Sequence, residues 1–153
     1  MGRKSGLNVN VTGLATLPAT ARRAQLYIKT VRLAFATARK TANGEISLIF
    51  VGRAKMLQIN RQYLGHDYDT DVITFQHDIP PGLPSAGLPI GDIFISAWMV
   101  RRQARELGHS ASVEAATLTS HGALHLLGHD DSKPRAKARM FKIQDRIVAS
   151  LRA

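Results

Sequence analysis

The feature that most constrains this chain is a short stretch, residues 121–131, in which metal-binding side chains recur at helical spacing. His121 and His125 are four residues apart, so on an α-helix both imidazoles project from one face. Gly128 follows and is suited to end the helix in a left-handed turn. Such a turn would direct Asp131 back toward the two histidines. The stretch therefore predicts a helix that ends at a metal site.

Two residues compete for the place of the third ligand. The spacing His-x3-His-x2-Gly-x2-Asp matches metzincin-type zinc sites with an aspartate in third place, which selects Asp131. The alternative is His129, whose offset of eight residues from His121 is the less familiar spacing. Without a metal, the two helical histidines would instead make hydrogen bonds in the core or interact with the helix dipole.

One residue in the stretch argues against peptide hydrolysis. Zinc proteases with this spacing carry a glutamate directly after the first histidine, where it acts as general base. Here that position is Gly122. The pattern therefore predicts a hydrolytic site without the base of a protease, and no other residue is singled out as a general base.

Length, composition and charge narrow the class of protein. The 153 residues predict a single domain, 1–153, with a hydrophobic fraction of 44% that is ordinary for a soluble protein. There is no cysteine, so disulfide partners and thiolate metal sites are excluded. No apolar run is long enough for a membrane span and no signal peptide is recognised, so we expect a cytoplasmic protein. The net charge of +10 favours nucleic acid as the partner.

Hydrophobic patterning predicts an α+β fold. Strands are expected where apolar or β-branched residues cluster, at residues 6–12, 45–51, 71–76 and 90–95. Helices are expected to begin near Pro18, Ala54, Ser96, Ser112 and Pro134, and Asn43-Gly44 is expected to end the first of them. The predicted architecture is a single small mixed sheet of about four strands packed with about five helices.

Three motifs give the chain a resemblance to the YbeY family of bacterial endoribonucleases. Residues 121–130 repeat most of the hallmark His-Gly-x-Leu-His-Leu-x-Gly-Tyr/His-Asp-His. A second family stretch is matched by Asn60, Tyr63, Asp67 and residues 70–75. A third, Leu/Ile-Gly-Asp-Ile-x-Ile-Ser, is matched by residues 90–96. The motifs occur in the family's order.

The resemblance implies a fold with a distant likeness to zinc-dependent proteases, and hence a zincin-like metal helix. It implies one metal ion per chain, usually taken to be zinc, held by the hallmark residues. It also implies cleavage of single-stranded RNA in rRNA maturation, at the three-prime end of small-subunit rRNA, and in ribosome quality control. The alternative is a non-catalytic RNA-binding assembly factor of the ribosome in which the ion is structural.

The chain departs from the family at two positions. Asp131 stands where the family has its third metal histidine, and a carboxylate widens the choice of ion from zinc toward other divalent metals such as manganese or magnesium. Leu64 stands where many members carry an arginine, and Arg61 lies one helical turn earlier as a partial substitute. Asp71 and Thr74 either orient the histidines or contact RNA, or they only cap and populate a strand.

Other residues bear on RNA binding. Two basic sets could follow an RNA backbone or could simply form solvated helix faces. One lies off the apolar stripe of the helix that follows Ser96 and consists of Arg101, Arg102 and Arg105. The other lies at the beginning of the last helix and consists of Lys133, Arg135, Lys137, Arg139 and Lys142. The aromatic residues Tyr63 and Trp98 are expected in the core rather than as platforms for bases. Asp92 is expected to be a turn residue after Gly91.

Overall fold

The computed structural model describes residues 6–38, 43–84 and 87–152. Within these ranges, four strands form one sheet in the order β1-β2-β4-β3. The strands are β1 (Leu7–Thr12), β2 (Gly44–Val51), β3 (Val72–Gln76) and β4 (Pro89–Ser96). β1, β2 and β4 run parallel to one another, whereas β3 is antiparallel to β4. The predicted mixed sheet is therefore confirmed.

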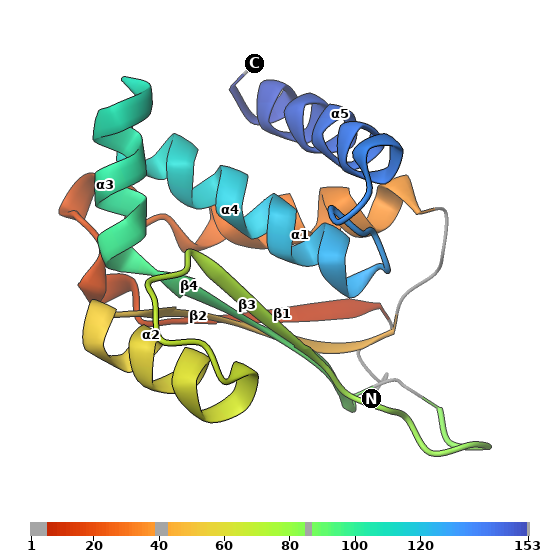
Figure 1. Cartoon of the computed structure of the whole chain (residues 1–153). Coiled ribbons are helices and arrows are strands. Elements are labelled where there is room, and N and C mark those ends of the chain that lie inside the picture. The colour runs from red at the N-terminus through yellow and green to blue at the C-terminus, as the bar shows by residue number, and fades with distance from the viewer. Residues whose placement is uncertain (1–5, 39–42, 85–86, 153) are drawn as a thin grey trace.

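Helices cover both faces of the sheet, as Figure 1 shows. The helix α2 (Arg53–Ile59) lies on one face, while α1 (Ala24–Thr37) and α4 (Ala111–Leu126) lie on the other. The long helix α5 (Pro134–Arg152) packs on the side of α4 that is turned away from the sheet, and α3 (Ala97–Leu107) stands beside α4. The predicted α+β class is confirmed, with five α-helices in the described part of the chain.

The first helix differs from its prediction at both ends. Pro18 precedes a short 3-10 turn, Ala19–Ala21, and α1 begins only at Ala24. The Tyr27 hydroxyl donates a hydrogen bond to the Ala21 carbonyl oxygen, which anchors that turn in the core. The helix ends at Thr37, and Gly44 is the first residue of β2 rather than a helix stop.

The other helix ends follow their local chemistry. Ser96 caps α3 as predicted, because its hydroxyl oxygen accepts a hydrogen bond from the Met99 amide at 3.2 Å. Ser110, not Ser112, caps α4, and its hydroxyl oxygen accepts from the Val113 amide at 3.2 Å. The turn after α2 widens into a π-helical segment, Asn60–Leu64, of the kind often found near functional sites.

Three predictions about single residues are corrected. Tyr63 is 61% exposed rather than buried, and only its edge contacts Phe75. Trp98 is partly exposed rather than buried in the core, and the guanidinium of Arg53 covers its ring at 4.0 Å. Asp92 lies within β4 rather than in a turn, and its carboxylate is 2.9 Å from Nε2 of His77.

The helix α4 is the centre of the molecule. It packs against α1, α3 and α5 as well as against β3 and β4, so most of its circumference is buried. Sequence periodicity predicts a single apolar stripe through Val113, Ser120, Leu124 and Leu127. This prediction was too narrow, since Leu118 and Ala123 are also buried and Val113 and Leu127 are only partly covered. None of the helices within the described ranges combines the length and hydropathy that a membrane crossing requires.

At Gly122, the backbone of α4 lies directly against side chains of the sheet. A β-carbon at this position would lie 2.6 Å from Cγ2 of Ile93 and 3.1 Å from Cγ1 of Val72. Ile93 has no exposed surface and is β-branched close to the backbone, so it cannot swing aside. The packing therefore requires glycine at this position, because there is no room for a side chain between the helix and the sheet.

Replacement of Gly122 by alanine should destabilise the protein. Overpacking against Ile93 should lower the free energy of unfolding by about 1–3 kcal/mol, although alanine favours a helix over glycine by about 1 kcal/mol. Urea unfolding should show a lower midpoint with an unchanged slope. The control is Gly52→Ala, because Gly52 has an ordinary φ of −71° and no atom within 4 Å of an added β-carbon. A Gly122→Ala protein as stable as this control would contradict the packing argument.

Candidate metal centre

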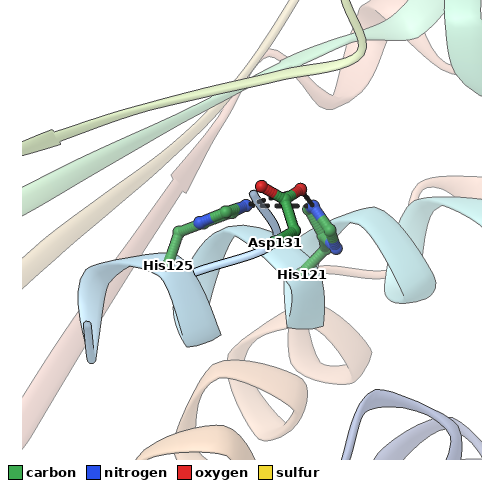
Figure 2. A group of neighbouring side chains, drawn as sticks. All are labelled: His121, His125 and Asp131. Atoms are coloured by element: carbon green, nitrogen blue, oxygen red, sulfur yellow. Dashed lines mark hydrogen bonds and ion pairs between the residues drawn. The ribbon is translucent and has the colours of Figure 1, made fainter. Parts of the chain in front are cut away.

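Three side chains meet at the C-terminal end of α4 (Figure 2). The Nε2 atoms of His121 and His125 are 3.1 Å apart. The carboxylate atom Oδ2 of Asp131 lies 3.6 Å from each of them. The four-residue spacing on the helix and the turn at Gly128, where φ is 95°, bring these atoms together as the sequence predicts.

The far nitrogen of each histidine is held by an oxygen atom. Nδ1 of His121 is 2.8 Å from Oε1 of Gln144 on α5, and Nδ1 of His125 is 3.1 Å from the carbonyl oxygen of His129. Both oxygens can only accept, so each Nδ1 carries the proton. In the neutral rings the two Nε2 lone pairs then point at each other and at a carboxylate. A cation between these three atoms relieves this repulsion.

The spacing of the donor atoms fits a small divalent ion. Zinc bonds nitrogen and carboxylate oxygen at about 2.0–2.2 Å in tetrahedral sites, which separates neighbouring ligand atoms by about 3.3 Å. The observed separations of 3.1, 3.6 and 3.6 Å bracket that value. Two histidines and one carboxylate can therefore hold a metal ion, with a fourth position left for water or substrate.

The free side of this site is an open cleft of about 380 Å³, which we call the metal cleft. It is lined by Leu64, residues 70–74, His121, His125 and Asp131. Its walls thus come from the π-helical turn, the start of β3 and the residues just before it, the end of α4 and the loop that follows α4. The lining residues, all of them described, include two carboxylates and no lysine or arginine.

A local hydrogen-bond network fixes the loop that carries Asp131. The carboxylate of Asp130 accepts from the backbone amide of Ser132 at 2.8 Å and from its hydroxyl at 2.6 Å. These two hydrogen bonds from Ser132 hold the pKa of Asp130 below its ordinary value. Asp130 therefore shapes the loop, while its neighbour Asp131 faces the histidines.

Of the other residues predicted for the site, some line the metal cleft and others do not. Asp71 and Thr74 line the metal cleft, but the Asp71 carboxylate accepts from the Val72 amide and from Nε2 of Gln103, not from a histidine. His129 contributes its main-chain carbonyl oxygen. Arg61 forms an exposed ion pair with Asp67 and is not among the residues of the cleft wall.

The sequence did not single out Gln144. It lies on α5, 23 residues beyond His121, and is buried. A glutamine on a helix has no signature that links it to a distant histidine. The only available signal was its place among the apolar positions of the last helix, where a polar side chain requires a partner.

The sequence of the chain is similar to those of known proteins. The family model "Endoribonuclease YbeY" matches residues 15–152. The Endoribonuclease YbeY of Elusimicrobium minutum is 39% identical over 108 residues, which is 71% of this chain and 75% of that protein. The Endoribonuclease YbeY of Lacticaseibacillus casei is 42% identical over 112 residues, 71% of this chain and 74% of that protein.

A solved structure has the same fold. The solution structure of a Thermotoga maritima protein superposes with a TM-score of 0.60 and covers 95% of this chain and 88% of that one. The two sequences are 21% identical, so this likeness bears on the fold alone.

Metal binding should depend on Asp131 and not on the side chain of His129. Asp131→Ala removes one donor atom and should weaken binding of zinc by about 100-fold or more, which exceeds the usual effect of residues outside the ligand set. His129→Ala keeps the carbonyl oxygen that holds His125 and should bind zinc as the unaltered protein does. Competition with a chromophoric chelator measures both. The reverse order of effects would make His129 the third ligand.

Gln144 should strengthen metal binding through His121. Gln144→Leu removes the acceptor for Nδ1 and should weaken zinc binding by about 10–100-fold. Gln144→Glu retains an acceptor oxygen and should keep the zinc affinity of the unaltered protein. Asp145→Asn is the matched control, since Asp145 is the exposed next residue on α5. Equal affinity of Gln144→Leu and the control, with unchanged unfolding midpoints, would show that Gln144 is not an orienting residue.

Proposed function

The chain belongs to the YbeY endoribonuclease family, and from this premise we propose that it is a metal-dependent endoribonuclease that cleaves single-stranded RNA. The observation that carries the proposal is the convergence of two histidine nitrogens and one carboxylate oxygen at the base of an open cleft. The net charge of +10 supports RNA as the substrate.

The proposed ligands are His121, His125 and Asp131, and the proposed ion is zinc, one per chain. When bound, the ion supplies Lewis-acid chemistry, because it activates water and stabilises negative charge on the phosphate. Two neutral imidazoles and one carboxylate leave a divalent ion with one net positive charge. Manganese or magnesium is the alternative, since a carboxylate is a harder ligand than imidazole.

The residues of the cleft make the proposed ion necessary for binding a phosphate. Asp71 and Asp131 place negative charge around the position that the RNA phosphate would occupy. Leu64 stands in the cleft wall where many family members carry an arginine, and Arg61 is engaged with Asp67. The charge that attracts the phosphate therefore comes from the ion, while exposed basic residues of α3 and α5 hold the RNA on either side.

A peptidase function is disfavoured by packing. The protease base would stand at position 122, where the contact with Ile93 admits no side chain.

A second candidate is a non-catalytic RNA-binding assembly factor with a structural ion, which the apolar Leu64 favours. In either case we propose rRNA as the natural partner, with maturation of the three-prime end of small-subunit rRNA and ribosome quality control as the processes served. This finer assignment rests on the family resemblance.

The test is cleavage of an end-labelled single-stranded RNA by the purified protein. Cleavage should stop in EDTA, return with zinc or manganese, and fall at least 100-fold in His121→Ala and His125→Ala. A duplex of the same sequence should be cleaved more slowly. His77→Ala is the matched control, because His77 pairs with Asp92 outside the metal cleft.

Two outcomes would overturn the proposal. Cleavage that survives in both histidine variants would come from a contaminating nuclease. Metal-dependent RNA binding without cleavage would support the assembly factor instead. A precursor with an extended small-subunit rRNA end tests the finer assignment, since it should be shortened in preference to an unrelated single strand of equal length.

A further inference from the structure

A second hollow of about 400 Å³, lined mainly by residues of α3, α4 and α5, adjoins the metal cleft. Asp71 and His121 line both hollows, so the two share a wall. We call this second hollow the side pocket, and its chief lining residues are Asp71, Glu106, Leu107, Glu114, Phe141 and Gln144. Figure 1 shows the three helices on the same side of the sheet.

Two apolar side chains form the mouth of the side pocket. Phe141 is 37% exposed, and Leu107 is 65% exposed. The Phe141 ring lies 5.8 Å from the ring of His121, and Nζ of Lys137 lies 5.8 Å from the centre of the Phe141 ring. A partly exposed aromatic ring beside the candidate metal centre, with a lysine ammonium group over it, can stack an unpaired base once the flexible lysine side chain turns toward the phosphate.

The inner wall of the side pocket is polar. Gln144 is only 5% exposed, and its Oε1 atom is engaged with His121. Among the described residues, the amide nitrogen of Gln144 has no hydrogen-bond partner, and the side chain lines the pocket. Glu114 is 2% exposed and contacts His109 at 2.8 Å, which leaves further lone pairs on its carboxylate. A solvent-accessible donor and several acceptors thus border the space.

The chemistry of this wall selects among ligands. Of the residues that the structure describes, three acidic ones and no lysine or arginine line the side pocket, and only Glu106 is paired with a guanidinium, that of Arg102 at 3.0 Å. The pocket is therefore suited to a neutral, flat group rather than to a phosphate. Adenine, cytosine and guanine present an exocyclic amino group to such acceptors, and also an acceptor for the Gln144 amide. Uracil presents two carbonyl oxygens and a single N–H, so it matches the acceptors less well.

We propose that the side pocket binds an unpaired RNA base with an exocyclic amino group, next to the phosphate held in the metal cleft. The proposal rests on the proposed function, because it assigns the pocket to the nucleotide that flanks the cleaved bond. Phosphate and base of one nucleotide then occupy the two hollows that meet at Asp71 and His121. Phe141 stacks on the base, and the polar wall distinguishes it from uracil.

Binding of uncleavable probes tests this assignment independently of cleavage. Dye-labelled 2′-O-methyl tetranucleotides of adenine, cytosine or uracil are titrated with the zinc-loaded protein and followed by fluorescence anisotropy, and gel electrophoresis afterwards confirms that each probe is intact. The adenine and cytosine probes should bind about tenfold more tightly than the uracil probe. Phe141→Leu keeps an apolar side chain and should lose about tenfold in affinity for them. Glu106→Gln should reduce the preference over uracil.

The control is Leu83→Ala, which removes an exposed apolar side chain from the loop between β3 and β4. Equal binding of all probes, or no effect of Phe141→Leu beyond the control, overturns the pocket assignment. N-acetyl-arginine amide provides a further comparison. If it perturbs the Phe141 signals in NMR spectra and none of the RNA probes does, the occupant of the pocket is a protein side chain and the assignment to RNA is overturned. Base-selective binding without metal-dependent cleavage would leave the pocket in place and overturn only the nuclease function.

Discussion

The structure depends on the close contact between α4 and the sheet at Gly122. Because no side chain separates the helix from Ile93, α4 lies deep in the molecule, with helices on its other sides. His121 precedes this contact, so its ring stands at the boundary between the core and the metal cleft. The same contact excludes the side chain that a protease would use as base. One packing constraint thus sets the position of the candidate metal ligands and excludes a protease base at position 122.

Charge in this molecule is divided between two kinds of surface. The net charge is +10, and the basic side chains of α3 and of the start of α5 are exposed. The metal cleft and the side pocket are instead lined by carboxylates, including Asp71, Asp131 and Glu114. Burial raises the pKa of Glu114, and the hydrogen bond from His109 acts in the opposite direction. Such a division suits an RNA enzyme whose outer surface attracts the polyanion while a bound cation receives one phosphate.

Much of the fold was predictable because its signals are local. The four strands follow β-branched runs, and Ser96 and Gly108 bound α3 as caps do in isolated helices. The errors arose where tertiary contacts override propensity. The turn at Ala21 is held by Tyr27, and Asp92, which the preceding glycine predicts to be a turn residue, lies in a strand that is paired on both sides. Helical spacing predicts Tyr63 in the core, but it lies in the π-helical segment and is exposed.

The sequence by itself determined that two histidines share a helix face and that a glycine turn returns an aspartate to them, because both follow from backbone geometry within eleven residues. It also determined the absence of the protease base. Only the tertiary structure decided which oxygens hold the two Nδ1 atoms, that Leu64 rather than Arg61 lines the metal cleft, and that Phe141 and Gln144 border a second pocket beside His121. These relations join residues from different elements, and their distances depend on how α3, α4 and α5 pack, which no local pattern encodes.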